Sequence, residues 1–233
     1  MMSSLRGRRA VVTGGSSGIG LATVKALLTK GAQVTVASRK DGAATMRGDV
    51  TSAEFAAKVM NDVKPELLVL CAGVTPTMGR FDELDWATFS EAWNTDLQAT
   101  FHFLKHALSM PRGSAVVVVS SGAALNGSPF SGGYAGAKRM QWWLADYAQR
   151  VSNERNLGLR FSTVVPEQLV TGTTIGTTAA TAYGAMAGTT AEAFMQRYEV
   201  QLDVDMVASA IVKALEGETS SVAVKGTGSR ALP

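Results

Sequence analysis

A glycine-rich turn between a strand and a helix is the feature that most limits what this chain can fold into. Residues 9–37 predict a strand, the turn TGGSSGIG at 13–20, a helix whose apolar residues lie at helical spacing, and a second strand at 32–37. Gly31 marks the end of the helix. The segment therefore predicts a strand–helix–strand unit.

The rest of the chain repeats this alternation of strands and helices. The later strands are apolar throughout instead of alternating, which is typical of a parallel sheet covered on both faces. We therefore predict an α/β fold, a doubly wound parallel sheet (Rossmann fold) with three layers α/β/α, in one domain over 1–233. Strands are expected at 66–73, 114–121, 159–166 and 220–225, and helices around 52–63, 85–109, 133–155 and 203–216.

Two segments depart from this regular alternation. After the strand at 32–37, a short strand near 45–47 follows too soon for a normal crossover, so we expect a loop where a helix would usually lie. The stretch 171–191 is rich in Gly, Thr and Ala. We expect a flexible substrate flap at about 171–200, with small hydroxyl side chains and no strong charge of its own.

Composition excludes several classes of function. The 22 Lys and Arg residues against 19 Asp and Glu residues give a net charge of only +3, and no dense basic run predicts a nucleic-acid or membrane surface. Cys71 is the only cysteine, so one chain can form neither a disulfide nor a thiolate metal cage. The sequence shows no signal peptide or membrane span, and we expect a cytoplasmic protein.

The glycine turn has the form of a phosphate-binding site. The first N–H groups of a helix and its partial positive charge attract an anion, and glycines let a phosphate approach the backbone. Gly14 would permit the turn, Gly18 the close approach, and Gly20 the packing of helix on strand. A purely structural turn is the alternative.

The end of the second strand favours NADP(H) over NAD(H). Ser38, Arg39 and Lys40 stand where an acidic residue would accept a hydrogen bond from the ribose of NAD. A guanidinium can instead form two charge-assisted hydrogen bonds with a 2′-phosphate. The alternative is that Arg39 and Lys40 are solvated loop charges.

Tyr134 and Lys138 form the candidate catalytic pair. They lie four residues apart at the start of a predicted helix, so their side chains can meet on one face. A lysine charge about 4 Å from the phenol would lower the pKa of Tyr134 by roughly three units, to near neutrality. We expect the two residues to lie outside the apolar stripe that packs on the core, which is formed by Met140, Trp143, Leu144, Tyr147 and Val151. A chance pairing is the alternative.

Several motifs together resemble the short-chain dehydrogenase/reductase family over almost the full length of the chain. TGGSSGIG, CAG at 71–73, Asn94, the serines at 120–121 and YAGAK at 134–138 occur in the family's order, and the turn has the spacing of its single-domain branch. The family implies an oxidoreductase that reduces a carbonyl or oxidises a secondary alcohol with a nicotinamide cofactor.

The resemblance also implies roles for individual residues. Tyr134 is the general acid and base, Lys138 lowers the phenol's pKa and holds the nicotinamide ribose, Ser121 steadies the substrate oxygen, and Asn94 supports a relay water. Ser120 could replace Ser121, but the spacing to Tyr134 favours Ser121. The predicted cofactor contacts are Gly14, Ser16, Ser17, Gly18, Ile19, Gly20, Ser38, Arg39, Asp49, Val50, Ala72, Gly73, Tyr134, Lys138, Leu169 and Thr171.

Two positions depart from the family pattern. Cys71 stands where the family usually has an asparagine that helps to lock the central strands. Glu167 follows Pro166 where the family has glycine, so a carboxylate is expected near the nicotinamide unless it points away.

The histidines and two neighbouring tryptophans are expected to have structural roles. His102 and His106 share a helix face without a third ligand, and no metal is predicted. Trp142 and Trp143 are expected in the core or an interface, and a homodimer or homotetramer is implied by the resemblance alone.

Three functions remain open for the chain. The first is an NADPH-linked oxidoreductase acting on a small molecule. The second is an NADPH-binding regulatory protein with little turnover, and the third is an isomerase or dehydratase that uses the same Tyr/Lys pair.

Overall fold

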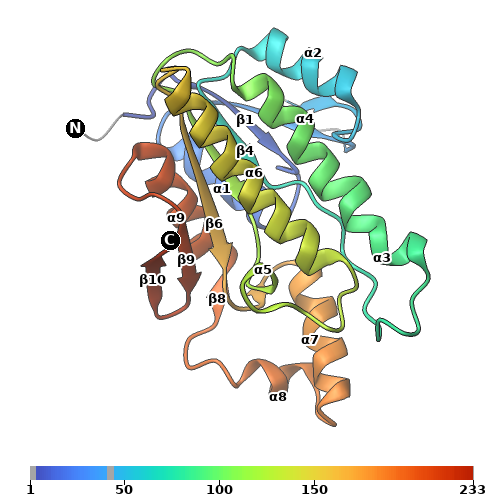
Figure 1. Ribbon diagram of the computed structural model, residues 1–233. Helices are drawn as coiled ribbons and strands as arrows, with labels where there is room; N and C mark the ends of the chain where they lie inside the picture. The colour runs from blue at the N-terminus through green and yellow to red at the C-terminus, as the bar shows by residue number, and fades with distance from the viewer. Residues whose placement is uncertain (1–3, 41–44, 233) are drawn as a thin grey trace.

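The fold is a central sheet covered by helices on both faces (Figure 1). The computed structural model describes residues 4–40 and 45–232. An eight-stranded sheet has the order β10-β9-β6-β5-β4-β1-β2-β3, and every pairing in it is parallel except that of β9 with β10. The predicted doubly wound α/β fold is thereby confirmed.

The strands of the large sheet are short and almost wholly buried at its centre. A second sheet pairs two further strands in parallel. The strands are β1 (Arg9–Thr13), β2 (Gln33–Ser38), β3 (Thr45–Arg47), β4 (Leu67–Leu70), β5 (Ala115–Val119), β6 (Arg160–Pro166), β9 (Val222–Lys225) and β10 (Gly228–Ala231), with β7 (Val170–Thr171) and β8 (Leu202–Asp203) in the second sheet.

The helices form the two outer layers. They are α1 (Gly18–Thr29), α2 (Ala53–Val63), α3 (Trp86–Ala92), a π-helical turn η1 (Trp93–Leu97), α4 (Gln98–Ala107), α5 (Ala123–Asn126), α6 (Tyr134–Glu154), α7 (Thr174–Met186), α8 (Ala191–Met195) and α9 (Val204–Glu216). None of these helices, within the described part of the chain, is long and apolar enough to cross a bilayer.

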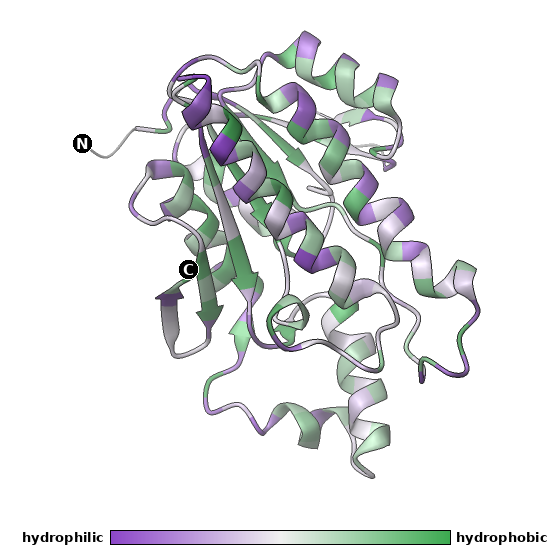
Figure 2. Cartoon of the chain, in the orientation of Figure 1, coloured by the Kyte–Doolittle hydropathy of each residue, from purple (hydrophilic) through white to green (hydrophobic). Residues whose placement is uncertain are grey.

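Two apolar clusters fix the layers to the sheet. One packs α1 and α9 on one face through residues such as Leu27 and Ile211, and the other packs α2, α4 and α6 on the opposite face through Val59, Phe103 and Ala145. The strands between them are hydrophobic in Figure 2. This double burial explains why the strand sequences do not alternate.

The strand order places the candidate site. From β1 the chain moves outward to β2 on one side, whereas β4 pairs with the other side of β1. Ligands of open α/β sheets bind beyond the carboxyl ends of the strands at such a switch point. The segments after β1, β4 and β5 therefore converge at one edge of the sheet.

The irregular segments predicted from the sequence are partly seen. β3 pairs with β2 in parallel at Thr45–Arg47, as the prediction of a short strand required. The expected loop falls mainly on residues 41–44, which lie outside the described residues. The expected single helix at 85–109 is broken by η1, and the proposed flap contains α7 and α8. That the flap moves stays a prediction.

The predicted packing of α6 is only partly confirmed. Leu144 packs against the core and Met140 and Val151 are half-buried, but Trp143 and Tyr147 are 43% and 47% exposed. The buried face instead carries small and polar residues, with Ala145 and Lys138 among them. Small side chains let the helix approach the sheet, and this same face brings Tyr134 and Lys138 inward.

Replacement of Phe103 tests the α4 side of the core. Phe103 is 0% exposed. We expect Phe103→Ala to lower the free energy of unfolding by about 3 to 5 kcal/mol, because it removes buried apolar contacts and leaves a cavity. Urea denaturation measures the loss. Phe101→Ala in the same helix is the matched control, since Phe101 is 46% exposed, and equal losses in both variants would contradict this packing.

Candidate active site

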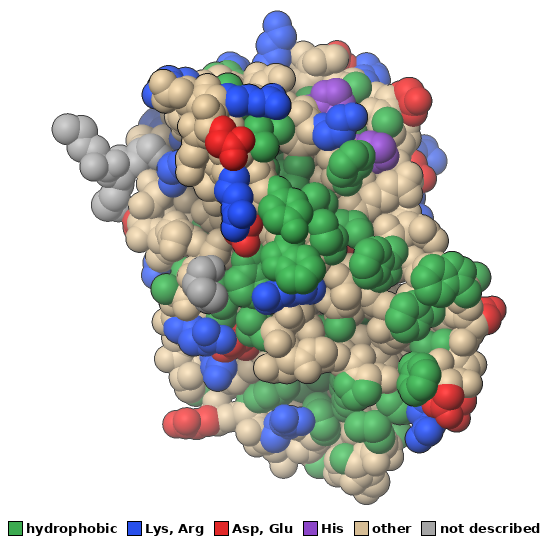
Figure 3. Space-filling view, in the orientation of Figure 1, with side chains coloured by type: hydrophobic (Ala, Val, Ile, Leu, Met, Phe, Trp, Pro, Cys, Tyr) green, Lys and Arg blue, Asp and Glu red, His purple; other side chains and the backbone are tan. Residues whose placement is uncertain are grey.

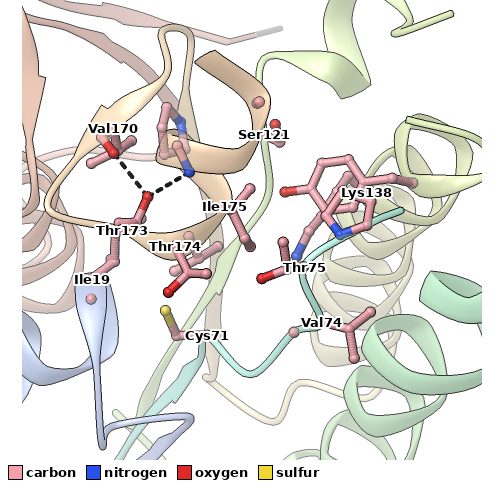
Figure 4. Close-up of a pocket in the computed structure, with 18 of the residues that line it drawn as sticks. Ile19, Cys71, Val74, Thr75, Ser121, Lys138, Val170, Thr173, Thr174 and Ile175 are labelled. Atoms are coloured by element: carbon pink, nitrogen blue, oxygen red, sulfur yellow. Dashed lines mark hydrogen bonds between the residues drawn. The ribbon is translucent and has the colours of Figure 1, made fainter. Parts of the chain in front are cut away.

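A single large cavity opens at the carboxyl edge of the sheet. It has a volume of about 720 Å³ and extends from the glycine turn to the start of α6. Figure 4 shows side chains from the loop after β4, from Ser121 and from Lys138 lining it together with those of Thr173, Thr174 and Ile175. All the predicted cofactor contacts except Thr171 line this cavity.

The glycine turn has the conformation that its sequence predicts. Gly14 has φ +68°, and a Cβ atom there would lie 2.7 Å from Ala72 Cα. A Cβ atom on Gly20 would lie 2.3 Å from the Gly14 carbonyl oxygen. Only glycine therefore fits these two places, and α1 is drawn tightly against the turn.

The start of α1 is suited to an anion. The side chain of its N-cap, Ser17, makes no capping hydrogen bond, so the first N–H groups of the helix are not capped by it. Ser17 and Gly18 line the cavity, and a Cβ atom on Gly18 would meet only the side chain of Thr173, at 3.4 Å. This arrangement fits a bound diphosphate.

Thr13 holds the segment that contains Cys71 against β1. The Thr13 hydroxyl accepts hydrogen bonds from the backbone N–H groups of Cys71 and Ala72, at 3.1 and 3.2 Å. It thereby ties β1 to the segment that follows β4. Burial raises the pKa of the Cys71 thiol to about 11, so the thiol is neutral at physiological pH.

The far end of the cavity holds the residues predicted to meet the adenosine. Ser38 is buried, and its hydroxyl accepts a hydrogen bond from Lys40 N at 2.9 Å. Arg39 is exposed at the cavity wall. Hydrogen bonds from Thr51 and the nearby Arg39 charge lower the pKa of Asp49. The Arg39 side chain is therefore exposed to solvent, and it lines the same cavity as Asp49 and Val50.

Tyr134, Lys138 and Ser121 meet at the other end of the cavity. Tyr134 is 8% exposed, and the side chain of Ser121 lies beside its phenol and lowers the pKa of that group. Lys138 Nζ lies over the Tyr134 ring, 5.4 Å from its centroid. Ser120 is turned away, because its hydroxyl donates to the Lys138 carbonyl oxygen at 2.8 Å. The structure thus groups Ser121, and not Ser120, with the phenol.

Asp96, and not Asn94, lies beside Lys138. The Lys138 Nζ atom is 3.0 Å from Asp96 Oδ2, and both side chains are buried. Asn94 is exposed, and its amide donates to Ser90 Oγ at 3.2 Å. Among the described residues no hydrogen bond or ion pair joins Asn94 to Tyr134 or Lys138. Asn94 lines the cavity together with Tyr134 and Ser121, so its predicted role in supporting a relay water stays a prediction, and Asp96 is a further residue beside Lys138.

Helix phase could have identified Asp96. The buried positions of α4 include Ala99, Phe103 and Ala107. Extending this stripe by one heptad toward the N-terminus gives Asp96 and Ala92, both buried, whereas Asn94 falls on the opposite side. The prediction of Asn94 rests on the order of motifs in the family, which carries no information on helix phase.

The electrostatic environment does not bring the Tyr134 phenol to neutrality. Burial raises the pKa of Tyr134, the Lys138 charge lowers it, the Asp96 carboxylate raises it and the Ser121 hydrogen bond lowers it, with a net rise. The expectation of a phenol that ionises near neutral pH considered Lys138 alone. It is wrong here because desolvation and Asp96 oppose that single charge.

The carboxylate of Glu167 is held by the C-terminal hairpin. It pairs with Arg230 of β10 and with Lys225 Nζ of β9, the latter at 3.4 Å. The backbone N–H of Glu167 donates to the Val224 carbonyl oxygen at 2.9 Å. Glu167 lines the cavity, and two cations neutralise its carboxylate there.

Thr171 is not a cavity residue. Its hydroxyl donates to the Leu202 carbonyl oxygen at 3.3 Å and so joins β7 to β8. Thr173 takes its place at the cavity wall and caps α7, accepting a hydrogen bond from Gly176 N at 2.9 Å. The predicted contact Leu169 does line the cavity.

Comparisons with known proteins identify relatives. A sequence model described as short chain dehydrogenase matches residues 8–183. A 2,5-dichloro-2,5-cyclohexadiene-1,4-diol dehydrogenase of Sphingobium indicum is 31% identical, over 71% of this chain and 74% of the relative. A cis-4-hydroxycyclohexanecarboxylate dehydrogenase of Sinomonas cyclohexanicum is 33% identical, over 56% of this chain and 61% of the relative.

A further relative matches over a smaller share of its length. A probable oxidoreductase of Streptomyces lividans is 36% identical over 54% of this chain, and the match spans about half of that relative, 48%.

Solved structures share the fold. The ligand-free aldohexose dehydrogenase of Thermoplasma acidophilum is 19% identical with a TM-score of 0.79, over 97% of this chain and 95% of that one. A short-chain dehydrogenase/reductase described as glucose/ribitol dehydrogenase from Brucella melitensis is 20% identical with a TM-score of 0.78, over 97% and 98%. At these identities the likeness concerns the fold alone. The family match, in contrast, runs through the sequence from the start of β1 into α7, and the chain therefore belongs to the short-chain dehydrogenase/reductase family of nicotinamide-dependent oxidoreductases.

Proposed function

We propose that this protein is an NADP(H)-dependent oxidoreductase that reduces a carbonyl group or oxidises a secondary alcohol. The observation that carries the proposal is the grouping of Ser121, Tyr134 and Lys138 in the cavity that also contains the glycine turn. Ala72 and Gly73 line the part of the cavity that connects these two ends.

The chain's own residues supply the proton and its control. Tyr134 donates a proton to the substrate oxygen in reduction and removes one from the hydroxyl in oxidation. Ser121 hydrogen-bonds that oxygen as negative charge develops on it. Lys138 holds a positive charge beside the phenol, which favours the ionised form of Tyr134. A nicotinamide bound in the cavity would supply or accept the hydride.

The cavity fits a dinucleotide along its whole length. The uncapped start of α1 would hold the diphosphate, and Asp49 and Val50 would flank the adenine. Arg39 would bind a 2′-phosphate, because its guanidinium is exposed at the cavity wall directly after β2. Lys138 would reach the nicotinamide ribose.

We infer that the substrate is a cyclic secondary alcohol or the corresponding ketone. Two relatives are named for such alcohols, a cyclohexadiene diol and a hydroxycyclohexane carboxylate. The flap side of the cavity carries an aromatic wall, in which Tyr183 and Phe194 stack with ring centroids 5.9 Å apart. Flat apolar surfaces of this kind suit a six-membered carbon ring.

We also retain the proposal of a homodimer or homotetramer. Large apolar side chains are exposed on neighbouring helices: Trp86 and Trp93 lie before α4, Phe101 lies on α4 and Trp143 lies on α6. Figure 3 shows hydrophobic side chains gathered over this face. A contiguous exposed apolar surface of this kind is typical of an interaction site.

Replacement of the phenol hydroxyl tests the reaction. We expect Tyr134→Phe to lower kcat/KM for cyclic alcohols or ketones by about 10²- to 10⁴-fold, because the proton donor is lost. The measurement is the absorbance of reduced nicotinamide with a panel of such substrates. Tyr147→Phe is the matched control, since Tyr147 lies on the same helix and is 47% exposed.

The same panel separates the alternatives. Tight NADPH binding without turnover on any substrate would support the regulatory protein, and conversion without net cofactor use would support the isomerase or dehydratase. Either result would contradict the proposed oxidoreductase.

Replacement of Arg39 tests the cofactor preference. We expect Arg39→Ala to weaken NADPH binding about tenfold or more while NADH binding changes little, because a charge-assisted contact with the 2′-phosphate is lost. Isothermal titration of both cofactors measures this. Lys25→Ala removes a positive charge from the exposed side of α1 and is the control. Equal preference for the two cofactors in wild type and Arg39→Ala would refute the assignment.

A further inference from the structure

The charge of Lys138 is shared between two acidic groups. Its Nζ atom lies 3.0 Å from Asp96 Oδ2 and 5.4 Å from the centroid of the Tyr134 ring. The exposed fraction is 1% for Asp96 and 5% for Lys138, so water screens this pair only weakly. The carboxylate is therefore as much a part of the phenol's surroundings as the ammonium.

Asp96 is fixed in this position. Its Oδ1 atom accepts hydrogen bonds from Val74 N at 2.8 Å and from the Thr95 hydroxyl at 3.1 Å. A Cβ atom on Gly73 would lie 2.6 Å from Asp96 Oδ2, so the loop after β4 closes over the carboxylate. Gln141 of α6 donates to the Asp96 carbonyl oxygen at 2.9 Å. These contacts fix the position of the Asp96 carboxylate.

We propose that Asp96 is a positioning residue that anchors the Lys138 ammonium and, by pairing with it, limits how strongly that charge acts on the Tyr134 phenol. The consequence for activity rests on the proposed function, whereas the consequence for the phenol does not. Asp96 touches neither the cavity nor the reacting atoms and acts through Lys138.

The charged and titratable groups that face Tyr134 come from three elements besides its own helix. Lys138 lies on α6, Asp96 on η1, Cys71 after β4, and the hydroxyl of Ser121 after β5. Burial and the Asp96 charge raise the pKa of Tyr134, while Lys138 and Ser121 lower it. Cys71 stays neutral because burial raises its own pKa to about 11. Asp96 is thus the one anion near the phenol at neutral pH among the described residues.

Lys138 keeps its proton over the same range. Burial lowers the pKa of the ammonium, but the charges of Asp96 and Tyr134 raise it further, and the net pKa lies above its usual value. The ammonium therefore does not titrate while the phenol does. A shift in the pH at which Tyr134 ionises therefore reflects the combined effect of two charges, those of Lys138 and Asp96.

The sign for the reaction follows from the proton balance. In alcohol oxidation the O–H proton passes to the Tyr134 phenolate while the carbon gives up a hydride, so oxidation needs the ionised phenol. Removing the Asp96 charge stabilises the phenolate and lowers the pKa of Tyr134. In a variant without the Asp96 charge, the rate of alcohol oxidation should therefore begin to decline at a lower pH than in the wild type.

A tyrosinate titration tests the proposal without any turnover. The ultraviolet absorbance of tyrosinate is followed from neutral to alkaline pH in wild type and in Asp96→Asn, and the spectrum of the matching Tyr134→Phe variant is subtracted to remove the other three of the four tyrosines. We expect the Tyr134 midpoint to fall by about one pH unit or more in Asp96→Asn.

Two further variants keep the test decisive. Asp96→Ser also removes the charge, and its hydroxyl can accept the hydrogen bond from Val74 N if Asp96→Asn folds poorly. Asp85→Asn is the matched control, because it removes a carboxylate from the exposed N-cap of α3 and asparagine caps equally well. We expect the control to leave the midpoint unchanged.

The possible outcomes are distinct. An unchanged midpoint in folded Asp96→Asn and Asp96→Ser would show a structural role only and overturn the proposal. A higher midpoint would also overturn it, since the carboxylate would then serve mainly to keep Lys138 charged. If the midpoint falls and no substrate is turned over, the proposal stands and the proposed function fails. If the protein is active, the pH profile of alcohol oxidation should shift by the same number of pH units as the midpoint of the Tyr134 titration.

Discussion

The buried ion pair between Lys138 and Asp96 is the constraint on which the geometry of the site depends. Burying two charges carries a large desolvation penalty, which their mutual attraction offsets. Removal of one partner typically lowers the free energy of unfolding by about 3 to 5 kcal/mol, because the other charge is left buried and unpaired. The pair joins α6 to the π-helical turn η1, and Asp96 also holds the loop after β4 through Val74 N. Tyr134, one helical turn before Lys138, is positioned by the same anchor.

The sheet supplies the other half of the site. The parallel strands β1, β4 and β5 end at one edge, so that the glycine turn, the segment at Cys71 and Ser121 converge although they are far apart in sequence. Thr13 fixes the first two segments to each other by accepting two backbone hydrogen bonds. The threonine that opens the glycine turn therefore also fixes the segment that contains Cys71.

Local patterns predicted the parts of the structure that depend on local rules. The strand–turn–helix unit and the meeting of Tyr134 with Lys138 follow from periodicity, glycine spacing and helix geometry, whereas Ser121 was assigned to this group by resemblance to the family. The strands β7, β8 and β10 were missed because elements of two to four residues carry no periodic signal, and Thr171, predicted as a cofactor contact, lies in β7. Asp96 was missed because the expectation for this helix rested on the family's order of motifs and not on the phase of its apolar residues. The direction of the Tyr134 pKa was missed because desolvation depends on burial.

The packing of α6 departs in part from the ordinary amphipathic pattern. A helix normally buries its large apolar stripe, yet here Lys138, Gln141 and Ser152 are buried and Trp143 is exposed. Each buried polar side chain has a partner: Asp96 for Lys138, the Asp96 carbonyl oxygen for Gln141, and the Leu159 carbonyl oxygen for Ser152. The inner face of α6 therefore carries Lys138 among small and polar side chains, with Trp142 as the one buried tryptophan of the helix. Trp143 and Tyr147 lie on the outer face, where we propose that another subunit covers them.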